Sequence, residues 1–439
     1  MNRSQSFVIF HFFPQFMFKT DYLSAIQLDS QDDLRNYRNR FHLPVQKNGK
    51  PHLYFCGNSL GCQPRTVRSY VETELADWAE LGVEGHFLGK NPWKNYHEFL
   101  TDSTARLVGA LPSEVVVMNA LTTNLHLLMA SFYRPTADKY KILIEADAFP
   151  SDAYAVESQL RLQGYDPEEG LLKIYPRQGE SCIRTEDIDA MIDEQGEEIA
   201  LILIGGVNYY TGQVFDMQHI TQKGHSKDIV VGFDLAHGAG NLVLNLHEWE
   251  VDFAAWCSYK YLNAGPGGVS GVFIHEKHAT NPETPRLAGW WGHEKETRFN
   301  MRHGFLPIQS AEGWQLSNAP VLAMAALRAS MEIFEEVGME KLNVKSRLLT
   351  GYLEFLLLSH FKDLIEIITP SDPKQRGCQL SVRFHQNGKA IHTALGKNGV
   401  ICDWREPDVV RLAPVPLYNS FLDVWEFGEV LKVVISQNR

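Results

Sequence analysis

The sequence predicts an α/β protein with a mostly parallel, doubly wound large domain followed by a smaller α+β domain. From Val115 to Ile274, apolar runs of strand length alternate with segments of helix length, which is typical of this class. The run 199–204 is apolar throughout, as in a parallel strand covered on both faces. With 439 residues, the chain is also too long for one compact core. We therefore expect an N-terminal arm and helix at 1–60, a large domain at 61–319, and linking helices with the small domain at 320–439.

The expected elements of the N-terminal segment and of the large domain follow here in chain order. A short helix is expected at 29–40, a short strand near Tyr54, and a helix opened by Pro64. Helices are also expected after Asn119, at 150–162, and in the crossover between the strands that end near Asp234 and Cys257. The expected strands lie at 115–118, 141–144, 199–204, 229–234, 252–257 and 271–274.

The C-terminal part alternates long helices with short strands. Pro320 is expected to open a helix that runs through Val337, and a second helix at about 339–360 would link the domains. The last helix is expected at about 420–435. The expected strands of the small domain lie at 378–384, 400–402 and 409–412.

Charge and cysteine content argue against several kinds of partner. The net charge is −12 and no block of basic residues occurs, which argues against nucleic acid or an anionic membrane surface. The six cysteines show no C-x-x-C spacing, so neither a zinc site nor a disulfide framework is expected. We therefore expect a cytoplasmic protein that binds no metal.

The aromatic segment 7–18 requires an interpretation of its own. It is too short to span a bilayer, Pro14 interrupts it, and no cleavage site of small residues follows. We interpret it as an arm rather than a signal peptide or a membrane anchor. No run of twenty apolar residues occurs elsewhere, so we expect no membrane-spanning segment.

The stretch 229–268 holds the strongest functional signal. Asp234 ends one apolar strand, and Lys260 follows a second strand about two dozen residues later. In an open α/β sheet both side chains would emerge at the carboxyl edge, where ligands bind. An acid that faces a lysine across a crevice is what pyridoxal 5′-phosphate (PLP) requires, because the lysine forms the Schiff base and the acid keeps the pyridine nitrogen protonated. Taken singly, Asp234 could be a helix cap and Lys260 a surface charge; their conjunction with Gly267 and Gly268 favours PLP.

Other polar and aromatic residues stand at the starts of expected helices and in loops. Thr122 and its neighbours begin a helix, which is either a phosphate cradle or a plain cap. Phe149 could cover a planar ring, and Ser151 and Asp152 could cap a helix. His86 lies in a loop that could roof a pocket. Arg411 could clamp a carboxylate or form a structural pair with an acid.

Several segments together resemble the kynureninase family, which belongs to the fold-type-I PLP-dependent enzymes. The resemblance runs from about Asp29 to the C-terminus. The FPSD motif and the run around Lys260 are specific to the family, whereas the Asp-x-Ala-His motif is shared by a wider branch with cysteine desulfurases and some aminotransferases. The matching segments are 57–61 (GNSLG), 119–126 (NALTTNLH), 149–152 (FPSD), 210–213 (YTGQ), 232–237 (GFDLAH), 256–264 (WCSYKYLNA), 289–290 (GW) and 411–419 (RLAPVPLYN).

The resemblance implies a role for each matching residue. Lys260 would form the Schiff base and remove the substrate's Cα proton, Asp234 would pair with the pyridine nitrogen, and Tyr259 would relay a proton. Arg411 would bind the substrate's α-carboxylate. The cofactor-binding set would be Leu121, Thr122, Phe149, Asp152, Asp234, His237, Tyr259, Lys260, Trp290 and Asn318, and the substrate-binding set would be His86, His293, Ser317, Asn318 and Arg411. Trp290 and Asn318 would come from a second subunit, which implies a homodimer.

The implied reaction is hydrolysis of the Cβ–Cγ bond of L-kynurenine or 3-hydroxy-L-kynurenine, to an anthranilate and L-alanine, in tryptophan degradation or NAD biosynthesis. Which substrate and which pathway stays open. The sequence departs from the family at Gly205, where a serine often stands near the phosphate; a backbone amide or a water would have to take its place.

Four alternative functions stay open beside this one. A cysteine desulfurase would need a mobile, exposed cysteine, whereas Cys378 and Cys402 are expected in strands. An aminotransferase would need a second keto acid. A catalytically silent PLP-fold protein would have little reason to keep Lys260 beside Asp234. A nicotinamide-binding enzyme is weaker still, because no G-x-G-x-x-G follows the first strand.

Overall fold

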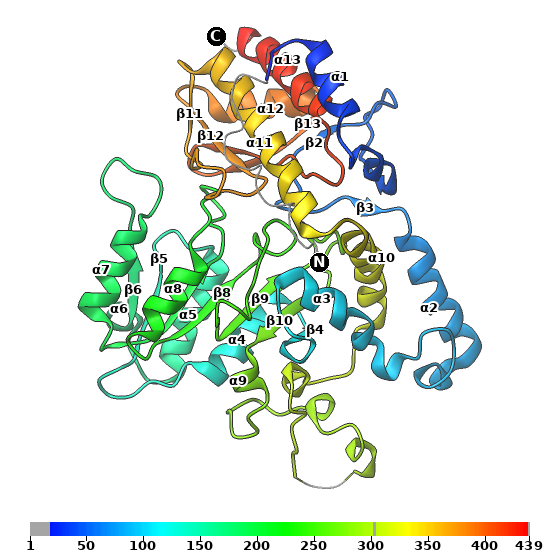
Figure 1. The fold of residues 1–439 in the computed structure, drawn as a ribbon, viewed down its shortest axis with the longest axis vertical. Coiled ribbons are helices and arrows are strands. Elements are labelled where there is room, and N and C mark those ends of the chain that lie inside the picture. The colour runs from blue at the N-terminus through cyan, green and yellow to red at the C-terminus, as the bar shows by residue number, and fades with distance from the viewer. Residues whose placement is uncertain (1–17, 302–303, 438–439) are drawn as a thin grey trace, which may run out of the picture.

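The protein is described by a computed structural model over residues 18–301 and 304–437 (Figure 1). Its large layer is a seven-stranded sheet in the order β4-β10-β9-β8-β7-β5-β6. Strand β10 runs antiparallel to its neighbours β4 and β9, and the other pairs are parallel, which confirms a mostly parallel sheet. The strands are β4 (Val115–Met118), β5 (Lys141–Glu145), β6 (Leu171–Ile174), β7 (Ile199–Gly205), β8 (Val230–Asp234), β9 (Phe253–Cys257) and β10 (Ser270–Ile274).

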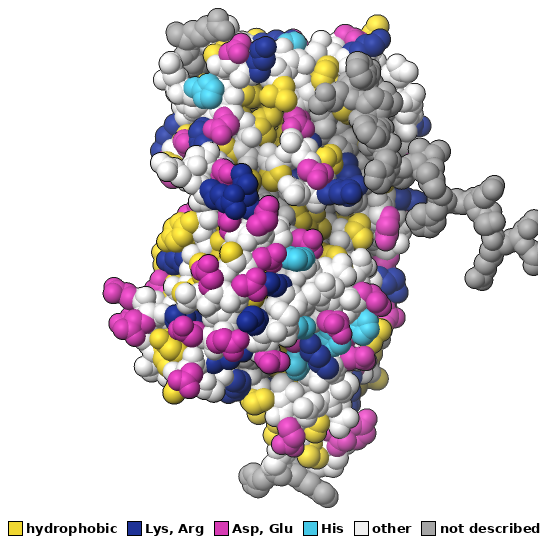
Figure 2. All heavy atoms as spheres, turned by 60° about the vertical axis from the view of Figure 1, so that its left-hand side comes forward, with side chains coloured by type: hydrophobic (Ala, Val, Ile, Leu, Met, Phe, Trp, Pro, Cys, Tyr) yellow, Lys and Arg dark blue, Asp and Glu magenta, His cyan; other side chains and the backbone are white. Residues whose placement is uncertain are grey.

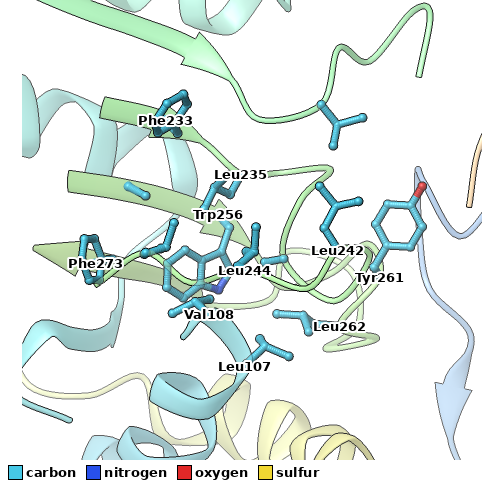
Figure 3. Packing of buried hydrophobic residues seen from close by; sticks show 14 of the residues in the cluster. Leu107, Val108, Phe233, Leu235, Leu242, Leu244, Trp256, Tyr261, Leu262 and Phe273 are labelled. Carbon is cyan, nitrogen blue, oxygen red and sulfur yellow. The ribbon is translucent and has the colours of Figure 1, made fainter. Parts of the chain in front are cut away.

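Both faces of this sheet are covered, because successive side chains of its apolar strands point to opposite sides. Ile142 and Ile144 of β5 belong to one apolar cluster with helices α4 (Leu121–Phe132) and α5 (Pro150–Leu162). Leu143 belongs to the cluster on the other face. There, Trp256 of β9 packs near Val108 of α3 (Thr101–Val108) (Figure 3). Helices α7 (Thr185–Gln195), α8 (Met217–His225) and α10 (Val321–Val337) supply further residues to this second cluster.

The connection between β8 and β9 differs from the sequence prediction. Residues 235–252, all of which the structure describes, contain turns and no α-helix, so the predicted crossover helix was wrong. Gly238 and Gly240 lie in this segment, and glycine is a poor helix former; Gly240 has a φ of 77°. The two strands nevertheless pair in parallel, with Asp234 opposite Ala255.

Two predictions near the N-terminus were also wrong in detail. The helix expected at 29–40 is replaced by α1 (Tyr22–Ser30) and a 3₁₀ helix at Arg35–Arg40. Between them the Asp32 carboxylate accepts a hydrogen bond from the Leu34 N–H at 2.9 Å, and a local bond of this kind competes with helix continuation. Pro64 lies in the short strand β3 (Gln63–Pro64), which pairs with β1 (Phe41–His42), and α2 (Val67–Leu81) begins only afterwards.

The smaller layer is a four-stranded antiparallel sheet in the order β11-β12-β15-β14, covered by α11 (Met339–Phe361), α12 (Gly388–Lys397) and α13 (Phe421–Gln437). Its strands are β11 (Ile365–Ile367), β12 (Leu380–Phe384), β14 (Asp403–Arg405) and β15 (Val409–Leu412). The strand expected at 400–402 is β13 (Val400–Ile401), which pairs in parallel with β2 (Leu53–Tyr54) outside this sheet.

The N-terminal segment lies against this smaller layer, in the upper part of Figure 1. The Asp29 carboxylate accepts hydrogen bonds from the N–H groups of Phe421 and Leu422, at 2.7 and 3.0 Å, where α13 begins. The division of the chain at residues 60 and 319 stays a prediction. Of the expected aromatic arm only Phe18 belongs to the described residues, and its ring lies 5.3 Å from that of Tyr352.

The surface carries acidic and basic side chains interspersed over the face shown in Figure 2. Within residues 18–301 and 304–437, no helix combines the length and the apolar character needed to cross a membrane.

Candidate active site

A cavity of about 210 Å³ opens where the carboxyl ends of β5, β7 and β8 meet the starts of α4 and α5. This edge is where open α/β sheets place their ligands. Eight of the residues expected to bind the cofactor or act in catalysis line this cavity together: Leu121, Thr122, Phe149, Asp152, Asp234, His237, Tyr259 and Lys260. The remaining lining residues are Ala120, Glu145, Ser151, Gly205, Val207, Tyr209 and Ala236.

Asp234 and Lys260 face the same space from neighbouring strands. Asp234 is the last residue of β8, is buried, and accepts a hydrogen bond from the Ala236 N–H at 2.6 Å. Lys260 follows the end of β9, and its Nζ lies 5.9 Å from the ring centroid of Phe149 and 5.8 Å from that of Tyr259. Burial raises the pKa of Asp234, and the positive charge of Lys260 opposes that rise.

The loop that carries Lys260 rests on Gly61. The Gly61 N–H donates to the Tyr259 carbonyl at 2.9 Å. A Cβ at position 61 would lie 2.3 Å from the Lys260 carbonyl oxygen and 2.9 Å from the Asn263 Cα, so this close approach requires glycine. The GNSLG segment, which is far away in sequence, therefore supports the lysine loop.

Three carboxyl groups lie at the cavity, of which Asp234 and Glu145 are buried and Asp152 is partly exposed. Asp152 and Asp234 form a side-chain hydrogen bond with each other, and burial, followed by the charge of Asp234, raises the pKa of Asp152 well above its usual value. Burial likewise raises the pKa of Glu145 to about 7, with further contributions from Asp234 and Asp147. Glu145 is a residue that sequence reasoning missed, because the end of a buried strand resembles an ordinary structural position.

The N-termini of α4 and α5 converge on the cavity. Neither helix has a side chain that caps its first N–H groups. The hydroxyl groups of Thr122 and Ser151 lie 2.8 Å apart, one in the first turn of each helix. Free amides and hydroxyls at helix starts bind phosphate, since they add donors to the positive end of the helix dipole. Ser151 had been interpreted only as a cap, and its place in the cavity depends on how the two helices meet.

These residues fit PLP. The cavity offers an amine at Lys260, a buried acid at Asp234, an aromatic face at Phe149 and two helix starts with hydroxyls for a phosphate. The buried Nδ1 of His237 has no hydrogen-bond partner among the described residues, which leaves a polar atom available beside the cavity. Burial, followed by the charges of Lys260 and Arg411, lowers the pKa of His237 well below its usual value, so that its ring is neutral.

Gly205 also lines the cavity, yet its backbone amide is not free for a phosphate. The Gly205 N–H donates to both oxygens of the Glu145 carboxylate, at 3.3 and 3.2 Å. In this arrangement the Gly205 amide therefore does not take the place of the missing serine hydroxyl, and the water that the sequence left as the other possibility stays open.

Arg411 does not line the cavity, but it lies directly behind it. Its guanidinium group donates to the carbonyl of Tyr209 at 2.7 Å, and Tyr209 lines the cavity. Arg411 also donates to the carboxylate of Asp403 and, at 3.2 Å, to the hydroxyl of Ser59. Both interpretations of Arg411 thus receive support: it is paired with an acid, and it stands beside the site. Ser59 and Asp403 were missed, because only the folded chain brings β14 and the GNSLG turn to Arg411.

The other expected substrate and cofactor residues do not reach this cavity within one chain. His86 ends the 3₁₀ helix Gly82–His86. Trp290 and His293 line a separate cavity of about 470 Å³, in the segment between α9 (Glu276–Ala279) and α10 that projects at the bottom of Figure 1. Ser317 and Asn318 follow in the same segment, just before α10.

The six cysteines fit a desulfurase poorly. None of them is exposed, and burial raises the pKa of every one of the six thiols. A reactive cysteine needs access and a lowered pKa.

Solved structures with the same fold include two cysteine desulfurases. One, from Thermococcus onnurineus NA1, is 16% identical with a TM-score of 0.71 and covers 88% of this chain and 95% of its own. The other, CsdA from Escherichia coli, is 17% identical with a TM-score of 0.73 and covers 92% of this chain and 99% of its own. At this identity the likeness shows the fold alone, and it confirms the predicted fold-type-I class.

Relatives in sequence are far more similar. Residues 342–431 match the family model described as the kynureninase C-terminal domain. The kynureninase of Koribacter versatilis is 58% identical over 92% of this chain and 95% of its own length. Those of Myxococcus xanthus and Flavobacterium psychrophilum are 56% and 55% identical, over 95% and 94% of this chain and 98% of each relative. The chain belongs to the kynureninase family.

Proposed function

We propose that the protein hydrolyses the Cβ–Cγ bond of L-kynurenine, of 3-hydroxy-L-kynurenine or of both, with PLP as cofactor. The products are anthranilate or 3-hydroxyanthranilate, and L-alanine. The observation that carries the proposal is that Lys260 and Asp234 line one cavity with two helix starts, in a chain more than half identical to proteins named kynureninase.

The chain's own residues divide the work of binding the cofactor. Lys260 Nζ would bind it covalently, and Asp234 would hold a proton at the ring nitrogen. Phe149 would cover the ring, while Thr122, Ser151 and the N–H groups of their helices would bind the phosphate. When bound, PLP supplies a ring that accepts electrons from the substrate's α-carbon.

Proton transfers fall to residues beside the cavity. Lys260 Nζ takes the proton from Cα. Burial raises the pKa of the Tyr259 hydroxyl, which therefore stays protonated and can donate a proton as the Cβ–Cγ bond of the hydrated ketone breaks. His237 stays neutral and can accept or donate one hydrogen bond at each ring nitrogen. Arg411 binds the substrate's α-carboxylate.

The test combines a spectrum with a product assay. Purified protein should show the visible absorbance band of covalently bound PLP and release anthranilate and alanine in equal amounts from kynurenine. Lys260→Ala should lose the band and the turnover, whereas Lys389→Ala, on an exposed side chain, should keep both. A Lys260→Ala variant with full turnover, or product release that requires an added keto acid, would contradict the proposal.

We further propose a homodimer in which Trp290 and Asn318 complete the active site of the partner subunit. Support comes from their position outside the cavity of their own chain and from the exposed apolar side chains of their segment, among them Leu287, Trp290 and Leu306. Mixing inactive Lys260→Ala and Asn318→Ala subunits tests this, because a mixed dimer contains one site with both residues intact. A 1:1 mixture should recover about a quarter of the wild-type activity. No recovery, although sedimentation shows mixed dimers, would contradict it.

The cellular setting belongs to the same proposal. We place the protein in the cytoplasm, in tryptophan degradation or NAD biosynthesis, without nucleic-acid partners. The absence of any basic block in the sequence supports the last point. Comparing turnover of the two kynurenines tests which pathway the enzyme fits.

A further inference from the structure

We propose that Arg405 is a second guanidinium group of the site that binds the substrate's α-carboxylate, beside Arg411, with Asp403 orienting both. This inference rests on the function proposed above. It names a residue by which the site distinguishes amino acids from amines that lack a carboxylate. Four observations carry it.

The first observation is a shared acceptor. One oxygen of Asp403, Oδ2, accepts hydrogen bonds from Arg411, from Arg405 at 3.0 Å and from the Ser59 hydroxyl at 2.7 Å. Arg405 and Asp403 lie on β14, and Arg411 lies opposite Asp403 on β15. Two guanidinium groups are therefore fixed side by side on a single carboxylate oxygen.

The second observation is that donors remain unused. The Nε of Arg411 and the Nε of Arg405 are both buried, and neither has a hydrogen-bond partner among the described residues. The Arg411 side chain is 1% exposed. A buried donor without an acceptor is destabilising, and more so on a charged group, so two of them together indicate an acceptor that comes from outside the chain.

The third observation is the balance of charge. Arg405 and Arg411 carry two positive charges against the single negative charge of Asp403. Although burial acts to raise the pKa of Asp403, Arg411, Ser59 and Arg405 together lower it, so this carboxylate stays ionised. The cluster keeps a net positive charge in a half-buried place, which favours an anion.

The fourth observation is location. Arg411 donates to the carbonyl of Tyr209, whose side chain lines the cavity. The charges of both Arg405 and Arg411 act on the buried ring of His237, which lines the same cavity beside Lys260. Both also act on the hydroxyl of Tyr209. The positive cluster thus lies within electrostatic reach of the groups that surround the reacting amino acid.

A carboxylate is the ligand that matches these donors. It is planar and has two oxygens, so that it can accept from two guanidinium groups at once, and such charge-assisted bonds are the strong ones. In this arrangement Asp403 does not compete for the Nε groups; it holds the two arginines through their terminal nitrogens and leaves the Nε groups to the substrate.

The test measures binding without turnover. L-alanine, the amino acid product, has no Cγ to lose, and ethylamine is the same molecule without the carboxylate. Both are titrated into the PLP-loaded protein and followed by the change in cofactor absorbance. Arg405→Gln should weaken L-alanine binding at least about tenfold and leave ethylamine binding unchanged. Arg405→Lys, which keeps the charge but not the fork of donors, should give an intermediate loss.

The control is Arg383→Gln on β12, which β15 separates from β14; there the arginine pairs with Glu366 and Asp408 away from the cluster. It should leave both affinities unchanged, and the unaltered cofactor band of each free variant checks that it is folded. Unchanged L-alanine affinity in Arg405→Gln, or an equal loss for ethylamine, overturns the inference. If Arg411→Gln weakens L-alanine binding in that case, the proposed function survives; if wild-type protein gives no anthranilate, the function itself fails.

Discussion

The carboxyl groups of Asp152 and Asp234 are hydrogen-bonded to each other at the edge of the cavity. Burial raises the pKa of both groups, and the charge of Asp234 raises that of Asp152 further. Asp152 is therefore the protonated partner that donates, and Asp234 is the acceptor that carries the negative charge. Two residues that are separated in the sequence by, among other elements, β6, α7, β7 and α8 thus act as one acid with one charge.

This pairing predicts different effects for two amide substitutions. Asp152→Asn keeps a donor toward Asp234 and should change PLP affinity less than threefold. Asp234→Asn removes the charge that holds a proton on the ring nitrogen and should cost on the order of 1.5–3 kcal/mol of PLP binding. Titration of the cofactor-free variants with PLP measures both. Equal losses of PLP affinity in the two variants would show that Asp234 is not the member of the pair that carries the negative charge.

A second prediction concerns Glu145 and pH. Because its folded-state pKa is raised from 4.5 to about 7, its contribution to stability is fully present below pH 4.5 and is lost as pH rises through 7. The loss approaches on the order of 3 kcal/mol above pH 8. Glu145→Gln stays neutral and should lack this decline. The free energy of unfolding of the variant should therefore rise relative to that of the wild type between pH 5 and 8. Urea unfolding across that range checks it, and parallel curves for the two proteins would contradict it.

A third prediction concerns Asp252, which joins β8 to the segments around it. Its carboxylate accepts from the Val231 N–H and from His225, His278 and Lys277, each at 2.8 Å. Although burial opposes them, these partners lower its pKa, so its stabilising effect is present above pH 3.8 and is lost as pH falls below that value.

Asp252→Asn should therefore destabilise the protein by about 1–3 kcal/mol at pH 7, since it takes the charged acceptor from the buried Val231 N–H and from its partly exposed basic partners. The control is Asp189→Asn, which breaks the half-exposed pair with His219 and should cost no more than about 1 kcal/mol. Urea midpoints measure both, and similar midpoints for the two variants would rule out a special role for Asp252.

A fourth prediction tests the support of the lysine loop. Gly61→Ala places a methyl group 2.3 Å from the Lys260 carbonyl oxygen, so the loop must shift. We expect about 1–3 kcal/mol of lost stability and weaker PLP incorporation. Gly396→Ala, in α12 with open space around it, is the matched control and should be neutral or slightly stabilising. Full incorporation of PLP by Gly61→Ala would count against this support.

The sequence predicted those parts of the site that strand ends determine. Asp234 and Lys260 follow apolar strands, and parallel neighbours bring their ends to one edge, so local pattern was sufficient. The crossover between them was predicted as a helix because its length allowed one, whereas its glycines favour turns.

Other parts of the site depend on contacts that local pattern does not encode. The sequence around Asp403 and Arg405 has the pattern of a polar loop. Only the pairing of β14 with β15 brings these residues to Arg411. Glu145 reads as a strand end, and its raised pKa arises from burial among other acids. The expected roles of Trp290 and Asn318 depend on contacts with a second chain, which local pattern does not encode either.

The pairing of β2 with β13, and of Asp29 with the start of α13, has a consequence for synthesis on the ribosome. Asp29 and the strand β2 leave the exit tunnel early and have to wait for almost the whole polypeptide before their partners are translated. The smaller layer can therefore be closed only when translation is nearly finished, and a nascent chain stalled before residue 400 would keep its N-terminal strand and helix exposed to chaperones.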